Sequence, residues 1–165
     1  MLQSELLDLK ANPDRLAEGA VVEAKVDKGR GTIATLLVQR GTLKAGDIVV
    51  AGTAWGKIRA LMNDKGKSVD QANPSSPIEI LGLDSTPVAG DDFIVVKDEK
   101  NARDLVALRL VRERQKRQTI AKQNTLESMF NKAKNGVKEL AIIIKGDVQG
   151  SVEAIAQSLA KLKNE

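Results

Sequence analysis

The stretch VVEAKVDKGRGTIATLLVQRGTLKAGDIVVAG, residues 21–52, decides the fold class of this chain. Two glycine-bearing turns, at 28–31 and 41–47, separate three short runs rich in β-branched residues. In the first run Val22, Ala24 and Val26 alternate with charged residues. This is the pattern of a strand with one buried face and one solvent-exposed face. Strands this close together, with turn residues between them, are typical of antiparallel pairing in a sandwich or barrel.

The β pattern continues from this stretch to about Lys97. Apolar runs at 56–62, 78–82 and 93–97 indicate further strands, and the segment 63–66, Asn-Asp-Lys-Gly, predicts a turn because these residues tolerate positive φ. Roughly 80 residues can sustain a small core. Closing the sheet removes its exposed edges. We therefore expect a mainly β fold, a small closed antiparallel β-barrel, over residues 14–99.

A long helix is expected after the barrel, over residues 100–136. No glycine or proline occurs from Glu99 until Gly136. The middle of this segment is polar, and its last third carries apolar residues at helical spacing, at 126, 129, 130 and 133. The polar middle indicates a solvent-exposed connector, which is either one continuous helix or two pieces with a bend near Asn124.

The first 13 residues predict the end of another structural unit. Leu2, Leu6 and Leu9 lie on one face of a short helix, which stops before Pro13 because the residue preceding a proline avoids helical geometry. About ten residues are too few for an independent helix in water. We expect this helix to pack against, or belong to, a preceding domain.

The last 29 residues, 137–165, predict the beginning of a further unit. Residues 140–144 are typical of a buried strand. A glycine-bearing turn follows, then a helix with Ser151 as N-cap and Glu153 in its first turn. One strand and one helix cannot form a sheet. We therefore expect a truncated α/β domain, and a chain that is a fragment of something longer.

The composition excludes several kinds of chemistry. Without cysteine or histidine, the chain has no thiolate nucleophile, no histidine base and almost no means of holding zinc. Its carboxylates are scattered and lack the spacing of a calcium or magnesium loop. No apolar run approaches membrane-spanning length, and acidic residues in the first ten positions argue against a secretion signal. We expect a cytoplasmic protein without membrane association, and neither catalysis nor a metal site in this segment.

Two glycine-rich segments fail as nucleotide-binding motifs. Gly29-Arg30-Gly31-Thr32-Ile33-Ala34 matches a loose dinucleotide fingerprint, but that fingerprint requires a following helix, and here a strand is expected. The loop 146–150 precedes a helix but contains an acid and no following lysine. No phosphate-binding loop of the Walker type occurs anywhere in the sequence.

Basic residues are concentrated rather than evenly spread. Residues 101–124 hold seven Lys or Arg against two acidic residues, which suits a polyanion partner or a solvated helix face. Near the expected turns, most basic residues are ordinary surface. Arg30 is the exception, because its flanking glycines let a phosphate approach the backbone while the guanidinium binds it. With only three aromatic residues, base stacking is not expected, and any RNA contact should involve phosphates and shape.

Several strings resemble one family. DKGRG at 27–31 with GTLKAGDIV at 41–49 is similar to the second-domain barrel of translational GTPases. PIEILGL at 77–83, VKDEKNAR at 96–103 and IKGDVQGSVEA at 144–154 resemble bacterial translation initiation factor two. The resemblance covers nearly the whole chain. It implies the end of a GTPase domain at 1–13, the barrel at 14–99, a linker helix at 100–136 and the start of a third domain at 137–165.

The resemblance also implies a function and partners. The family's barrel docks on the small ribosomal subunit, largely through ribosomal RNA, and the following helix relays the nucleotide state. GTP, magnesium and initiator tRNA would be bound by other domains of the factor, so this segment is expected to hold no cofactor and to be no enzyme. A monomer is expected. For the RNA contact, charge and turn position favour Lys28, Arg30, Lys57 and Arg59.

Two other functions remain as alternatives. The segment could gate or retain GTPase activity, although it lacks phosphate-loop chemistry. It could also be a purely mechanical spacer whose basic helix is a solvated strut, in which case neutralising Arg112, Arg114 and Arg117 would leave ribosome affinity unaltered.

Overall fold

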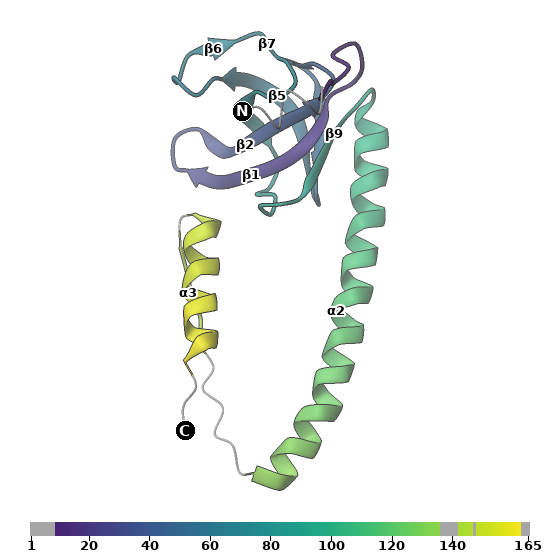
Figure 1. Cartoon of the computed structure of the whole chain (residues 1–165). Helices are drawn as coiled ribbons and strands as arrows, with labels where there is room; N and C mark the ends of the chain where they lie inside the picture. Colours follow the sequence, from purple (N-terminus) through teal and green to yellow (C-terminus); the bar gives the residue numbers. More distant parts are fainter. Residues whose placement is uncertain (1–8, 136–141, 147, 163–165) are drawn as a thin grey trace.

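The protein is described from a computed structural model, in which residues 9–135, 142–146 and 148–162 are described (Figure 1). A β-barrel is followed by a long helix that lies against one side of it and extends well beyond it. The elements are β1 (Glu18–Asp27), β2 (Gly31–Arg40), β3 (Leu43–Lys44), β4 (Ile48–Ala51), β5 (Ala54–Met62), β6 (Ser68–Val69), β7 (Gln71–Ala72), β8 (Pro77–Leu83), β9 (Asp92–Val96), α2 (Glu99–Asn135) and α3 (Gln149–Lys161).

The main sheet closes on itself. Its strand order is β4-β9-β1-β2-β8-β5-β6, and β4 also pairs with β5, which completes a barrel of six antiparallel strands. All four residues of β4, Ile48–Ala51, pair with β9 on one side and with β5 on the other. The predicted closed antiparallel barrel is confirmed.

The barrel interior is an aliphatic core around one aromatic ring. Phe93 is completely buried, as are Leu36, Leu61 and Ile80. These residues belong to one cluster to which all six barrel strands contribute. A core built from β-branched and leucine side chains is what a sequence with 2% aromatic residues requires.

The prediction that Val22, Ala24 and Val26 form the buried face of the first strand is wrong in part. Ala24 is buried, but Val22 and Val26 are 54% and 63% exposed, and Val21 is buried instead. The register of β1 against β2 shifts between Val21 and Glu23. Such a bulge reverses which residues face the core. Val26 pairs beside the hairpin turn, and it lies outside the core cluster.

Three two-residue strands were not expected from the sequence. β3 and β7 form a separate two-stranded sheet, and β6 pairs with the end of β5. Two residues are too few to show periodicity. The turn predicted at 63–66 is present, because the Asn63 Oδ1 accepts the backbone N–H groups of Lys65 and Lys67.

Helix α2 begins at Glu99, one residue before the expected start, and runs unbroken to Asn135. Of the two alternatives, the continuous helix is therefore the one observed, and Asn124 lies within it. Ala102 and Val106 of its first turns are buried against Val50 on the outer face of β4. The apolar positions expected at 126–133 lie outside the described side chains.

The expectations for the last segment are only partly met. Residues 142–146 form no strand, and Ile142 and Ile143 are 56% and 86% exposed. A buried strand needs a neighbouring strand, and the only pairing of the described tail is an isolated bridge between Val148 and Lys25 of β1. Residues 140 and 141 lie outside the described residues.

The start of α3 also differs from the prediction. The helix begins at Gln149 and its N-cap is Val148, which makes no side-chain cap hydrogen bond, so Ser151 is not the N-cap. Because the helix begins three residues earlier than expected, Glu153 falls outside its first turn.

The helix predicted before Pro13 falls mainly on residues 1–8, outside the described part, and residues 9–12 are not helical. Among the described residues, no helix combines the length and the apolar character that crossing a membrane requires.

Because Phe93 supplies the one aromatic ring of the core, we expect its truncation to lower the stability of the barrel strongly. Phe93→Ala should lower the free energy of unfolding by about 3–5 kcal/mol, because it leaves a cavity that the barrel cannot fill. Urea unfolding followed by Trp55 fluorescence measures this. Val26→Ala, at an exposed position of β1, is the control and should cost less than about 0.5 kcal/mol. A similar cost for both variants would contradict the described core.

Candidate nucleic-acid interface

The β1–β2 hairpin presents two of the predicted residues on a stiff turn. The Asp27 Oδ1 accepts the backbone N–H of Gly29 at 2.8 Å and that of Arg30 at 2.9 Å. These two hydrogen bonds, that from Gly29 first, lower the pKa of the Asp27 carboxyl. The side chain of Asp27 therefore organises the turn from within, as aspartate does at many turns. Lys28, at the tip, is exposed.

The guanidinium of Arg30 is largely available to a ligand. Its Nη2 lies 3.8 Å from the Asp27 Oδ2, and the Arg30 side chain is 58% exposed. An exposed ion pair at that distance stabilises little. A phosphate can replace it at small cost, because the Asp27 carboxylate keeps its two backbone hydrogen bonds.

The other two predicted residues lie on an irregular part of β5. The pairing of β5 with β8 shifts between Gly56 and Ala60, so Lys57 and Arg59 lie opposite Gly82. Gly82 has a φ of +124°, and a Cβ there would overlap the Lys57 carbonyl. Glycine is therefore required for the close approach of the two strands. Lys57 and Arg59 are both exposed, as expected where a bulge turns side chains outward.

The strand register brings the two pairs of cations to one end of the barrel. Ile33 at the base of the hairpin pairs with Leu81 of β8, and Leu81 pairs with Ala60 of β5. Two strand spacings separate β2 from β5 here, about 10 Å. The hairpin and the β5 bulge thus lie two strands apart at the same end. We call Lys28, Arg30, Lys57 and Arg59, with the turn and bulge that carry them, the basic end.

Sequence reasoning missed Lys25. It pairs with Ile33 and lies on the outer face of β1, next to the hairpin. Its Nζ is 3.9 Å from the Glu79 Oε1, and both side chains are partly exposed. In the sequence, the only signal for Lys25 was its place among the charged residues that alternate along the first run. Its position beside the basic end follows from the pairing of β1 with β2.

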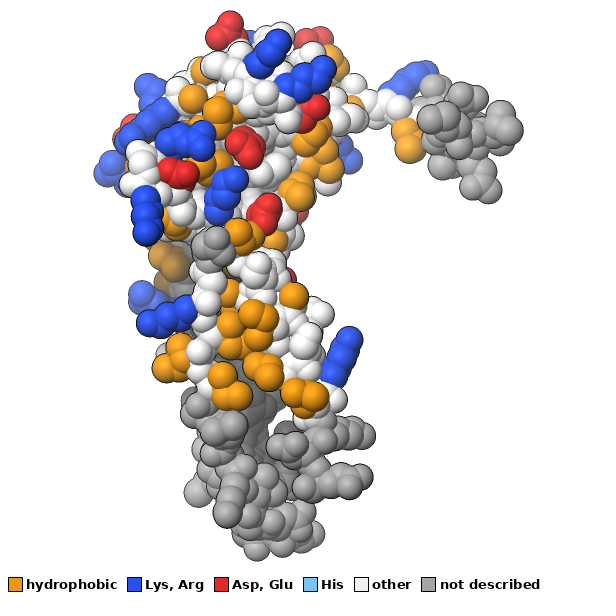
Figure 2. All heavy atoms as spheres, turned by 90° about the vertical axis from the view of Figure 1, so that its left-hand side faces the viewer, with side chains coloured by type: hydrophobic (Ala, Val, Ile, Leu, Met, Phe, Trp, Pro, Cys, Tyr) orange, Lys and Arg blue, Asp and Glu red, His pale blue; other side chains and the backbone are white. Residues whose placement is uncertain are grey.

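The acids at this end are mostly occupied by backbone groups. Asp27 accepts two N–H groups, and the Asp84 Oδ1 accepts the N–H of Trp55 at 3.0 Å. The Asp27 carboxylate thus holds its own turn, and the Asp84 carboxylate holds the backbone of β5. Figure 2 shows Lys and Arg side chains spread over one face of the barrel, with fewer acidic side chains among them.

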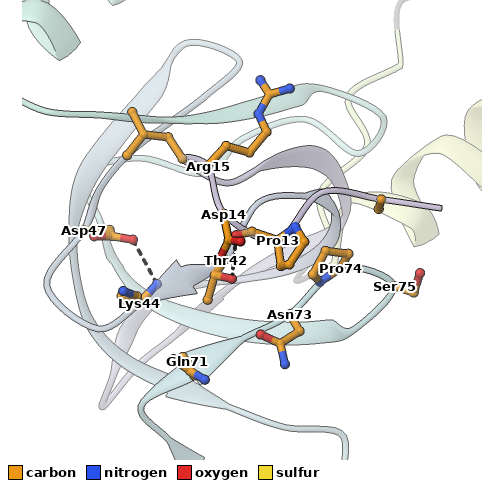
Figure 3. Close-up of a pocket in the computed structure, with 12 residues that line it drawn as sticks. Pro13, Asp14, Arg15, Thr42, Lys44, Asp47, Gln71, Asn73, Pro74 and Ser75 are labelled. Carbon is orange, nitrogen blue, oxygen red and sulfur yellow. Dashed lines mark hydrogen bonds between the residues drawn. The ribbon is translucent and has the colours of Figure 1, made fainter.

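A groove of about 990 Å³ lies at the end of β2 opposite the β1–β2 hairpin and was not anticipated. Figure 3 shows Lys44 and Asp47 on one side of it and Pro74 and Ser75 on the other. The Thr42 hydroxyl donates to the Pro13 carbonyl at 2.9 Å. Its charged lining residues balance: Asp14, Arg15, Lys44 and Asp47. A neutral groove does not suit a polyanion, so the basic end is the better nucleic-acid candidate.

The chemistry that the basic end offers is the binding of anions. The sequence has neither histidine nor cysteine, and within the described ranges no three carboxylates converge to hold a metal ion. What the basic end provides is a set of fixed, exposed cations at the spacing of neighbouring strands.

Comparison with known proteins gives family matches over two parts of the chain. A family model described as elongation factor G domain 2 matches residues 16–96, the barrel. A second, described as translation-initiation factor 2, matches residues 115–165. The crystal structure of GDP-bound aIF5B from Aeropyrum pernix has a TM-score of 0.52 and 20% identity, covering 96% of this chain and 26% of that one. This likeness concerns the fold.

Curated relatives match the chain from end to end. A translation initiation factor IF-2 of Paramagnetospirillum magneticum is 54% identical over 166 residues, covering 100% of this chain and 19% of the relative. The IF-2 of Cereibacter sphaeroides is 57% identical, with 99% and 20% covered, and that of Clostridium botulinum is 54% identical, with 100% and 24% covered. The chain thus spans about a fifth of the length of these relatives.

The hairpin geometry predicts a pH-dependent turn. The folded-state pKa of Asp27 is lowered, so its carboxylate stabilises the hairpin above the unfolded-state value, about 3.9. That stabilisation is lost as the pH falls through the lower, folded-state pKa.

Amide NMR resonances of Gly29 and Arg30 should therefore shift together, with a midpoint below the value of an unstructured aspartate. The same titration of Asp27→Asn is the control, and there the transition should be absent. A midpoint at or above the unstructured value would show that the carboxylate does not hold the turn.

Proposed function

The chain belongs to the bacterial translation initiation factor IF-2 family, and from this premise we propose that its barrel docks the factor on ribosomal RNA of the small subunit. The relatives' shared name gives translation initiation as the process. The match of residues 16–96 to elongation factor G domain 2 supports the choice of the barrel as the docking module. The docking surface we assign is the basic end.

One observation carries this assignment: the basic end holds exposed cations on a framework that is already rigid. Arg30 extends from a turn fixed by Asp27, and Arg59 from a bulge that Gly82 permits. Because these backbones are ordered before binding, little conformational entropy is lost when a phosphate binds.

The kind of contact follows from the side chains available. Trp55, the single tryptophan, is half-buried against α2, with the Arg103 guanidinium 5.1 Å from its ring centroid. It is thus engaged within the chain and does not form a stacking platform of the kind that binds single strands. Contacts from Lys and Arg to phosphates, which read the shape of folded RNA, fit the surface better.

The remainder of the proposal concerns the whole factor. We assign GTP and magnesium binding, initiator tRNA binding and subunit joining to parts of the relatives beyond the matched segment. Residues 14–99 act as the docking barrel, and 100–136 as the connector that relays movement to the unit beginning at 137. We further propose that the factor works as a cytoplasmic monomer.

A mechanical spacer is the second candidate function. It is favoured by the exposure of α2 beyond the barrel, where Leu110 and Val111 are 38% and 51% exposed. A spacer would bind RNA only through its general charge. The two proposals therefore differ in whether one particular arginine matters more than another of equal charge.

Arg30→Ala should weaken binding of this chain to purified small ribosomal subunits about fivefold, and should lower the slope of log affinity against log salt by about one. Loss of one phosphate contact accounts for both effects. Binding is measured across a salt series with bulk RNA as competitor.

Arg40→Ala is the matched control, because Arg40 is exposed at the other end of β2 and its Nη1 is 2.9 Å from the Glu18 Oε1. Equal effects of the two substitutions, or binding abolished by competitor RNA, would support the spacer and contradict docking through the basic end.

A further inference from the structure

The apolar contact between α2 and the barrel is confined to the first part of the helix. Ala102 is fully buried and Val106 is 8% exposed, both against Val50. Leu105 packs beside them with partial exposure. Beyond Arg109, Leu110 and Val111 are exposed. Residues 99–109, about three helical turns, are therefore the seated part of α2.

Two arginines border this seated part. Near its start, Arg103 lies over the ring of Trp55, 5.1 Å from the centroid. At its end, the Arg109 Nη1 donates a hydrogen bond to the Gly52 carbonyl oxygen at 2.7 Å, and this bond is partly buried. A charged donor at this distance makes a strong hydrogen bond, and partial burial protects it from solvent.

The acceptor of the Arg109 bond is itself fixed. Gly52 has a φ of +56°, and a Cβ at this position would overlap the carboxylate of Asp91. The Gly52 N–H donates to the Asp92 carbonyl at 3.2 Å. The β4–β5 turn is thus held against the loop that leads into β9, so its carbonyl oxygen cannot follow the helix.

We propose that Arg109 is a positioning residue that sets the angle at which α2 leaves the barrel. The bond to Gly52 is the last described hydrogen bond from an α2 side chain to the barrel. Beyond it, Arg112, Glu113 and Lys116 line a pocket together with Thr53, Asp91 and Asp92, and we call the helix after Arg109 the free arm. This inference rests on the proposed relay function, because it identifies the residue that couples the barrel to the arm.

Because the free arm is long, a small change in this angle moves its far end by a large distance. From Arg109 to Asn135 the helix extends about 39 Å at 1.5 Å per residue. A tilt of about 10° at Arg109 would move the far end by roughly 7 Å, simply because the arm is rigid and long. Small changes at the Gly52 turn are therefore enlarged at the end of the connector.

The experiment measures this angle directly. The sequence has no cysteine, so spin labels can be placed at Lys67→Cys on the barrel and Gln118→Cys on the arm, both exposed positions. Pulsed electron paramagnetic resonance then gives the distribution of distances between them, in this chain without ribosomes.

Arg109→Ala should broaden the distribution, because the arm then pivots about Val106. Arg109→Lys keeps a donor for Gly52 and should restore most of the narrow distribution. Arg114→Ala removes the same charge from an exposed helix position and should leave the distribution unchanged. The Trp55 emission and the urea midpoint show whether each barrel remains folded.

A distribution for Arg109→Ala that equals the parent's, or one for Arg109→Lys as broad as that for Arg109→Ala, would overturn the assignment. An equal broadening by Arg114→Ala would do the same, because the effect would then be one of charge. Ribosome affinity is measured separately with the Arg30 variants, so failure of the positioning role and failure of docking are distinguished.

Discussion

The pairing of β4 with both β9 and β5 is the constraint on which the other features depend. A four-residue strand closes the sheet, and closure removes the free edges that an open sheet of this length would expose. It also fixes the circular order of the strands. The outer face of β4 and its neighbours then becomes the seat of α2, while the hairpin and the β5 bulge lie at one end of the strands. Both the packing of α2 against the barrel and the position of the basic end therefore follow from the strand order.

The fold class was predictable because alternation and turn chemistry are local. The Asn63 turn, the start of α2 near Glu99 and the closed barrel follow from residues adjacent in sequence. The bulges are different, because a bulge depends on the register of the partner strand. This is why the apolar alternation around Val22 indicated the wrong face, and why the β5 irregularity opposite Gly82 was invisible.

The candidate site likewise has features that the sequence could predict and features that it could not. Lys28 and Arg30 share a turn, so their proximity could be inferred, whereas their closeness to Lys57 and Arg59 depends on β8 lying between β2 and β5. Lys25 and the neutral groove were missed because each depends on segments distant in sequence. The prediction of a strand near residues 142–146 was wrong for a related reason. These residues have a strand-like composition but no described neighbouring strand to pair with.

The groove and the β1–β2 hairpin lie at opposite ends of β2, whose ten residues span about 33 Å. Effects of substitutions separated by more than about 10 Å, without shared partners, are generally additive. Residues of the hairpin can therefore vary to suit one binding partner without disturbing the residues that line the groove. The barrel thus carries two separate surfaces, the hairpin and the groove, each of which can diverge while the closed core between them stays the same.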